Sequence, residues 1–261
     1  MHPRCAKIVL PLAKGELEGV GTPCGPPLKG DGRSNTCTTV PHALIATAQR
    51  ENIFRTEDQV IRTVLFDMGN VLVHFCHDRM CDQIGALCGR SGPEVRNLLI
   101  DSGLQWEFER GQVSEEGFRA RLEEATGSRL DLDEVRQAGS DIFTLNEPIV
   151  PLLDALRRRN HRLVLLSNTS ISHFEFVSRE FDVLSRFDDY VTSYGVGAVK
   201  PEPAIYEAAK QAINCAPEEC FYTDDIPEYV HAAREHGFEA EVFIGVPQLK
   251  AHLQDRGVSI E

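Results

Sequence analysis

The sequence predicts an α/β protein: a parallel sheet with helices on both faces and an all-helical insert after the first strand. Two observations carry this prediction. From residue 60 onward, short apolar, β-branched segments alternate with longer amphipathic segments. This alternation is typical of parallel strands joined by crossover helices. It is interrupted only over residues 77–147, where the patterns are all helical.

Five segments have the length and β-branched composition of strands, beginning with VIRTVLF. The expected strands are 60–66, 161–168, 189–196, 220–225 and 239–245. The expected connecting helices are 147–160, 172–181, 201–213 and 226–237. Since crossover connections in a parallel sheet cover its faces with helices, the sheet should be buried on both sides.

The interval 77–147 is expected to contain consecutive helices and no strand. Ser114 is suited to cap one of them, although Gly117 stands where a capping box needs Glu or Gln. A helical insert over an open sheet is typical of a cap domain that excludes water from a site. The expected helices are 78–89, 92–103, 104–111, 114–127 and 131–143.

We therefore divide the chain into three parts. Residues 1–58 are dense in Gly, Pro, Ser and Thr without an apolar period, and are expected to form a disordered extension. Residues 59–76 and 148–261 should form the α/β core, and residues 77–147 the helical cap.

Composition limits the partners of the protein. The 261 residues include 27 basic and 40 acidic side chains, a net charge of −13, which argues against nucleic-acid binding. No apolar run reaches the roughly 18 residues that span a bilayer. The apolar run near the start is too short for a signal peptide. We expect a cytoplasmic monomer or homodimer that acts on a small metabolite.

The eight cysteines show no framework spacing, which favours reduced thiols. His74, Cys76, His77 and Cys81 are residue types that bind zinc, but the lack of paired C-x-x-C units argues against a zinc site.

Polar side chains follow four of the expected strands at the point where each strand ends. Because ligands bind at the carboxyl ends of parallel strands, these side chains should converge. Each alone is also explained as a turn or helix-capping residue. Their recurrence at successive strand ends favours a shared site. The residues are Asp67, Ser167, Asn168, Lys200, Asp224 and Asp225.

This set of groups is suited to phosphoryl transfer. Three carboxylates provide the oxygen ligands that Mg²⁺ prefers. Ser167, Lys200 and the backbone N–H groups near Gly69 and Asn70 are suited to hold phosphoryl oxygens. Asp67 could then attack phosphorus and form an aspartyl-phosphate.

The segments VLFDMGNV, VLLSNTS, GAVKPEP and CFYTDDIPEYVHAAREHG occur in this order. Together they resemble the four motifs of the haloacid dehalogenase (HAD) superfamily, over roughly residues 60–250. The resemblance implies a Rossmann-like core and a hydrolase. Within the superfamily, FDMGNVLV, ERGQVSEEGF and LSNTS are similar to phosphatases that act on α-glucose 1-phosphate. The phosphatase domain of soluble epoxide hydrolase is a more distant relative.

The resemblance also implies a role for each matching residue. Asp67 would be the nucleophile and a metal ligand, and Lys200 would steady it. Ser167 and Asn168 would contact the phosphoryl group. The remaining Mg²⁺ ligands would be Asp224, Asp225 and the backbone carbonyl of Gly69.

Two positions depart from the family pattern. Gly69 replaces the second Asp that usually protonates the leaving group, and Tyr229 replaces an Asp or Asn in the fourth motif. Since general acid help is typically worth about 10²–10⁴ in rate, Gly69 favours a good leaving group such as an anomeric sugar oxygen. His74 is a possible substitute acid, although a surface histidine explains it more simply.

Three functions are compatible with these residues. A Mg²⁺-dependent phosphatase is favoured, because paired acids beside a nucleophilic carboxylate repel one another without a metal. A hydrolytic 2-haloacid dehalogenase also lacks the second acid. A catalytically weak binding or regulatory domain would explain Gly69 and Tyr229, but not the retained Asp67 and Lys200.

Overall fold

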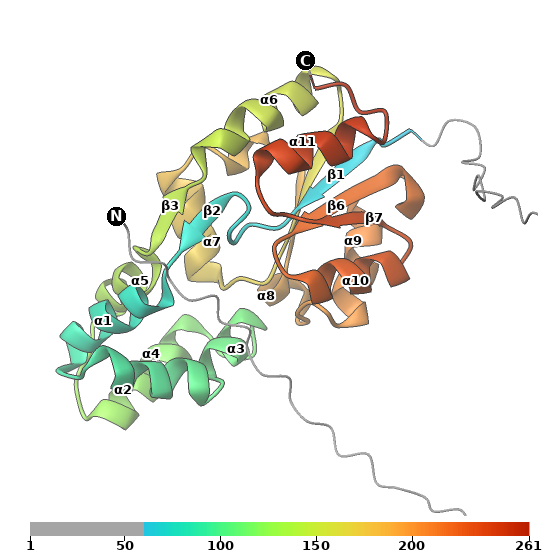
Figure 1. Cartoon of the computed structure of the whole chain (residues 1–261). Coiled ribbons are helices and arrows are strands. Elements are labelled where there is room, and N and C mark those ends of the chain that lie inside the picture. Colours follow the sequence, from blue (N-terminus) through green and yellow to red (C-terminus); the bar gives the residue numbers. More distant parts are fainter. Residues whose placement is uncertain (1–59, 261) are drawn as a thin grey trace, which may run out of the picture. The chain divides into compact units, whose positions relative to one another are not determined.

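The structure, a computed structural model, describes residues 60–260 (Figure 1). The expectation for residues 1–58 lies outside this range. Five parallel strands form one sheet in the order β5-β4-β1-β6-β7. The α/β fold with a parallel sheet is therefore confirmed. The strands are β1 (Thr63–Phe66), β4 (Arg162–Ser167), β5 (Asp189–Thr192), β6 (Cys220–Asp224) and β7 (Glu239–Val242).

Strand β1 lies at the centre of the sheet and is fully buried. Its first residue, Thr63, pairs with Arg162 on β4 and with Cys220 on β6. Just beyond the strand, the N–H of Asp67 donates to the carbonyl of Thr223 at 3.0 Å. This register places Asp67 between the carboxyl ends of β4 and β6.

Helices cover both faces of the sheet. In Figure 1, α9 and α10 lie on one face, and α6 and α11 lie on the other. The face under α9 and α10 is packed with aliphatic and aromatic side chains, among them Leu65, Leu166, Ile205 and Val230. The helices are α6 (Val150–Arg158), α7 (Ile171–Glu180), α8 (Ser193–Val196), α9 (Pro203–Ala212), α10 (Pro227–Glu235) and α11 (Val246–Gln254), with short 3-10 turns at Glu147–Ile149, Leu184–Arg186 and Pro217–Glu219.

The strand expected over 189–196 is shorter than predicted. It ends at Thr192, and the chain continues as the single helical turn α8. Gly195 weakens an extended conformation, and Gly197 ends the turn in the left-handed region with φ 79°. Helix α11 was not anticipated from the sequence.

Between β1 and α6, the chain forms a helical insert, which we define as helices α1 to α5. Figure 1 shows these helices gathered together beside β2 and β3. Ser114 caps α4 as expected, since its hydroxyl accepts a hydrogen bond from the N–H of Gly117 at 3.1 Å. The elements are α1 (His77–Cys88), α2 (Gly92–Arg96), a π-helical turn (Asn97–Asp101), α3 (Leu104–Glu109), α4 (Glu115–Thr126) and α5 (Leu132–Ser140).

The expectation of no strand within 77–147 was wrong. β3 (Phe143–Leu145) lies within this interval. It pairs antiparallel with β2 (Val73–Phe75), which precedes the interval, and the two strands form a ribbon where the chain enters and leaves the insert. Both strands have only three residues, so their alternation of buried and exposed positions is too short to recognise in sequence. The ribbon holds the two chain connections of the insert side by side.

No helix within residues 60–260 has both the length and the apolar character needed to cross a membrane.

Candidate active site

Asp67 and Lys200 form a buried ion pair at the centre of the strand ends. The Lys200 Nζ donates to Asp67 Oδ1 at 2.8 Å and to Asp224 Oδ2 at 2.6 Å. Only 1% of Lys200 and 7% of Asp67 is exposed. One ammonium therefore bridges two carboxylates, and this bridge joins residues from three different strand ends.

Burial strongly affects the ionisation of this pair. Desolvation raises the pKa of Asp67 to about 7, an effect that Lys200 opposes and that Asp224 and Asp225 increase. Burial also disfavours the Lys200 ammonium, but the two carboxylates outweigh it and raise the pKa of Lys200. Burial and the neighbouring carboxylates thus favour protonation of Asp67, and a nearby positive charge would oppose this.

Tyr222 joins this network and was missed by sequence reasoning. Its hydroxyl donates to Asp224 Oδ2 and lies 3.1 Å from Lys200 Nζ. The other oxygen of Asp224 accepts from the N–H of Ile226 at 2.8 Å. Asp224 therefore holds Lys200 in place. Since side chains alternate along a strand, Tyr222 and Asp224 share one face of β6, and this spacing was the available signal.

Asp67, Asp224 and Asp225 form a carboxylate cluster. One oxygen from each lies within 4.8 Å of the others. Three carboxylates against one ammonium leave an excess of negative charge, and oxygen donors at this spacing fit a hard divalent cation. Among residues 60–260, this is the group of acidic, histidine and cysteine side chains with the spacing of metal ligands.

The loop after β1 supports this cluster. Asn70 adopts a left-handed conformation with φ 55°, which asparagine tolerates. Its side-chain amide donates to Asp225 Oδ2 at 3.1 Å, and its backbone N–H donates to the Val73 carbonyl at 2.7 Å. The N–H that was predicted to meet a phosphoryl group is therefore used within the loop, and the Asn70 side chain orients an acid.

Ser167 and Asn168 follow β4 and lie beside Lys200. Ser167 is buried, as expected for a group at the end of a central strand. The Asn168 side chain makes two hydrogen bonds with the backbone of Lys200, accepting from its N–H at 2.7 Å and donating to its carbonyl at 3.1 Å. The Asn168 amide therefore positions Lys200, and its predicted phosphoryl contact would have to come from its backbone.

Tyr229 completes the surroundings of Lys200. The Lys200 Nζ lies 5.2 Å from the centre of the Tyr229 ring, a cation–π distance. The Tyr229 hydroxyl is 3.5 Å from the Asn168 side-chain nitrogen. Tyr229, which departs from the family pattern, therefore lies next to Lys200 and Asn168 in the candidate site.

The space next to Gly69 is filled by an aromatic ring. A Cβ at this position would lie 2.9 Å from Cε1 of Phe75 and 3.8 Å from Asp67 Oδ2. The region where the second acid of the family pattern would project is therefore occupied by Phe75. His74 is exposed and precedes Phe75 on β2, so it points to the opposite side of the ribbon. The suggestion that His74 replaces the acid finds no support in this arrangement.

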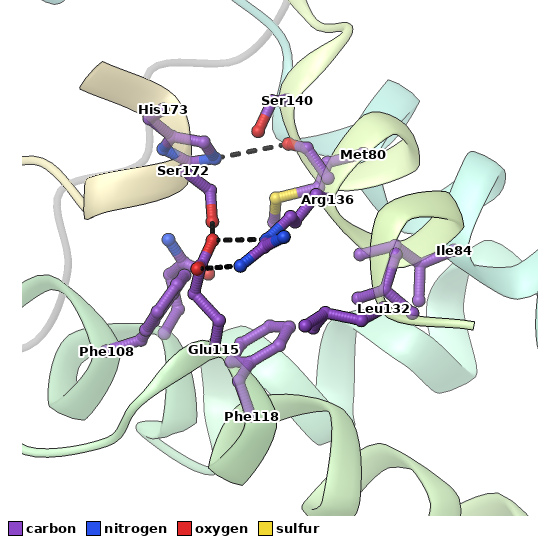
Figure 2. Close-up of a pocket in the computed structure, with 13 residues that line it drawn as sticks. Met80, Ile84, Phe108, Glu115, Phe118, Leu132, Arg136, Ser140, Ser172 and His173 are labelled. Carbon is purple, nitrogen blue, oxygen red and sulfur yellow. Dashed lines mark hydrogen bonds and ion pairs between the residues drawn. The ribbon is translucent and has the colours of Figure 1, made fainter. Parts of the chain in front are cut away.

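The insert contacts the core beside the loop that carries Ser167. The Ser172 hydroxyl, at the start of α7, donates to Glu115 Oε1 at 2.6 Å, and Arg136 Nε donates to the same oxygen at 2.8 Å. His173 lies next to them, with Nε2 3.1 Å from the Gly139 carbonyl. Figure 2 shows these side chains meeting from α4, α5 and α7 around a small pocket.

Comparison with known proteins identifies the family. The model of the haloacid dehalogenase-like hydrolases matches residues 61–237. The chain belongs to this family. A HAD-like hydrolase structure from Porphyromonas gingivalis is 27% identical, covers 75% of this chain and 98% of its own, and has a TM-score of 0.65. A HAD family enzyme from Bacteroides thetaiotaomicron, in complex with magnesium and inorganic phosphate, is 24% identical over 70% of this chain and 93% of its own, with a TM-score of 0.63.

The curated relatives are named for two kinds of activity, phosphatase and dehalogenase. D-ribitol-5-phosphate phosphatase from Bacteroides thetaiotaomicron is 29% identical over 69% of this chain and 90% of its own length. A phosphatase from Mycobacterium tuberculosis is 28% identical over 69% of this chain and 86% of its own. Haloacetate dehalogenase H-2 from Moraxella is 30% identical, but only over 33% of this chain. The chain is thus a HAD-like hydrolase with relatives that are named as phosphatases.

Proposed function

We propose that this HAD-like hydrolase is a Mg²⁺-dependent phosphatase that cleaves a small phosphomonoester, preferably a sugar phosphate, through an aspartyl-phosphate on Asp67. The observation that supports this best is the carboxylate cluster of Asp67, Asp224 and Asp225, in which one buried ammonium bridges Asp67 and Asp224. A site with this charge is suited to a cation and a phosphoryl group together. The names of the curated relatives support the same reaction class.

In the proposed reaction, an Asp67 oxygen attacks phosphorus, and the bond from phosphorus to the leaving-group oxygen breaks. The leaving oxygen keeps the electron pair and takes up a proton. Water then attacks the phosphorus of the aspartyl-phosphate, which releases inorganic phosphate and restores the Asp67 carboxylate. Lys200 fixes the Asp67 carboxylate during both steps and offsets charge on the phosphoryl oxygens.

The residues present fit a magnesium ion. Asp67, the Gly69 carbonyl and Asp225 would hold it, and Asp225 is already oriented by Asn70. Asp224 would act through water, because its oxygens accept hydrogen bonds from Lys200, Tyr222 and the Ile226 N–H. When bound, the ion supplies positive charge to the phosphoryl oxygens.

The substrate class is proposed on three grounds. Gly69 lacks the usual acid, which favours leaving groups that depart with little protonation, as in sugar 1-phosphates. One curated relative carries the name of a polyol phosphate. The net charge of −13 favours a small metabolite over nucleic acid. We retain the proposal of a cytoplasmic monomer or homodimer.

The test is phosphate release from a panel of glucose 1-phosphate, glucose 6-phosphate, ribitol 5-phosphate and p-nitrophenyl phosphate, with Mg²⁺ or EDTA. We expect Mg²⁺-dependent release that Asp67→Asn lowers by at least about 10³-fold, as for removal of a nucleophile. Unchanged release in Asp67→Asn would refute the nucleophile assignment. Halide release from 2-haloacids in EDTA, with no phosphate release, would instead identify a dehalogenase.

A further inference from the structure

We propose that Glu109, at the end of α3 in the insert, donates a proton to the leaving-group oxygen. Gly69, which stands where the family usually has an acid, cannot donate this proton. This inference rests on the proposed phosphatase function and names a further residue for it. The core supplies no acid at position 69, because the Phe75 ring occupies the adjacent space. A proton donor for a basic leaving group would therefore have to come from another element.

The end of α3 is held against the core beside the phosphoryl site. The Ser193 hydroxyl donates to the Glu109 carbonyl at 2.6 Å and accepts from the Thr169 N–H at 2.9 Å. Thr169 directly follows Ser167 and Asn168. One buried hydroxyl on α8 therefore ties the backbone of Glu109 to the loop expected to hold the phosphoryl group.

The two residues after Glu109 fix the same contact. Arg110 forms an ion pair with Glu202, which also accepts a hydrogen bond from the Val199 N–H at 3.2 Å, next to Lys200. A Cβ at Gly111 would lie 2.6 Å from the Tyr194 carbonyl, so only glycine permits this approach of the insert to α8. Glu109 is thus the carboxylate on the segment where the insert meets the active-site loops.

The Glu109 carboxylate is close enough to Tyr229 to influence it electrostatically. Burial is the main cause that raises the pKa of Tyr229, and the Lys200 charge opposes it. The carboxylates of Asp224, Asp67 and Glu109 add smaller increases. Tyr229 in turn lies over Lys200 and beside Asn168. Within residues 60–260, no cation pairs with Glu109, and the hydrogen bond to its carboxylate comes from Gln105 at 2.9 Å.

This environment suits an acid that works at neutral pH. Burial raises the pKa of Glu109 to about 7, and the hydrogen bond from Gln105 opposes the shift only in part. A carboxyl with this pKa carries a proton in a large fraction of molecules at pH 7 and gives it up readily. In the step that breaks the phosphorus–oxygen bond, the leaving oxygen receives this proton, and Glu109 is left as a carboxylate. Glu109 then regains its proton from solvent, and the proton of the attacking water leaves with the inorganic phosphate.

The test compares leaving groups of different basicity in Glu109→Gln and in the matched control Glu107→Gln. Glu107 lies on the same helix, where it pairs with Arg121 within the insert. With glucose 6-phosphate, whose alkoxide leaving group needs a proton, we expect Glu109→Gln to lower kcat by about 10²–10⁴-fold. With p-nitrophenyl phosphate, whose leaving group needs none, we expect less than about a threefold change. Glu107→Gln should match the wild type on both substrates.

Three results would overturn the assignment. One is an equal loss on both substrates, which indicates a structural role. Another is a raised KM with unchanged kcat on the sugar phosphate, which indicates a binding contact. The third is an unchanged kcat of Glu109→Gln on glucose 6-phosphate. In that case no residue replaces the missing acid, and the wild type should strongly prefer glucose 1-phosphate over glucose 6-phosphate. Melting temperatures and a Glu109→Asp variant, expected to regain part of the kcat, separate catalysis from misfolding. No phosphate release from p-nitrophenyl phosphate by the wild type would refute the phosphatase proposal itself.

Discussion

At the scale of single residues, the site depends on how Lys200 and Asp67 are surrounded. Lys200 is held by Asp67, Asp224, Tyr222 and the Leu166 carbonyl, four partners from three strand ends. A buried ammonium without such partners would carry a large desolvation cost. The surrounding residues therefore maintain the charge that the proposed chemistry needs, and they explain why a carboxylate is stable at the end of a buried strand.

The Phe75 ring restricts the size of the side chain that position 69 can accept. We expect Gly69→Ala to lower the free energy of unfolding by about 1–3 kcal/mol, because the new methyl group would press on the Phe75 ring. Chemical denaturation measures this change. Phe75→Leu removes the contacting ring atom and should restore part of the loss in the double variant. The control is Gly139→Ala in α5, where a Cβ meets only Ile84 at an ordinary 3.8 Å and should be tolerated. Equal stability of the two alanine variants would contradict the role of Phe75.

At the scale of elements, α7 links the insert to the loop after β4 that carries Ser167 and Asn168. Glu115 on α4 is contacted by Arg136 on α5 and Ser172 on α7, and its side chain is only 13% exposed. Burial disfavours the charged carboxylate, but the hydrogen bonds from Arg136 and Ser172 outweigh it and hold the pKa of Glu115 below its ordinary value. The contact therefore depends on Arg136 remaining in place.

We expect Arg136→Met to lower the free energy of unfolding by about 1–3 kcal/mol, because a half-enclosed carboxylate would lose its charged partner. Arg121→Met is the matched control, since Arg121 and Glu107 form an exposed pair in the same insert worth about 0–1 kcal/mol. Denaturant titration measures both variants. Hydrogen exchange should show faster exchange in α4 and α5 for Arg136→Met alone, and a similar cost for both variants would contradict the linking role.

At the scale of the whole molecule, the contact between insert and core contains a buried histidine. His173 is 7% exposed, and burial lowers its pKa from 6.5 to about 4, with a further contribution from His77 and an opposing one from the Gly139 carbonyl. A group with a depressed folded-state pKa stabilises the fold above its unfolded pKa. This stability is lost as the pH falls from about 6.5 toward 4, where the unfolded chain binds the proton and the folded chain does not.

We therefore expect the free energy of unfolding to fall between pH 7 and pH 5 by about 2 kcal/mol more in the wild type than in His173→Gln. Glutamine can donate a hydrogen bond to the Gly139 carbonyl but does not titrate. Urea unfolding at the two pH values measures the difference, and contributions of other groups cancel in the comparison. His231→Gln is the control, since His231 is exposed on α10 and pairs with Glu235 on the same helix. Parallel behaviour of wild type and His173→Gln would rule out the effect.

Much of the fold could be predicted from the sequence because its signals are local. Apolar strands and amphipathic helices have periods that a short window reveals, and all five strands of the sheet were found. The polar residues at strand ends could be brought together by reasoning alone, since the carboxyl ends of parallel strands lie at one edge. The three-residue strands β2 and β3 and the turn α8 could not be predicted, because segments this short show no recognisable periodicity.

What only the tertiary structure decided concerns contacts between distant segments. The sequence by itself determined the parallel sheet, the place of Asp67 at the end of its first strand, and the convergence of Lys200, Asp224 and Asp225 upon it, whereas the central position of that strand came from the structure. The filling of the space beside Gly69 by Phe75, and the approach of Glu109 to the site, arise from packing between elements. Such contacts depend on the shapes and orientations of side chains far apart along the chain, which no local pattern encodes.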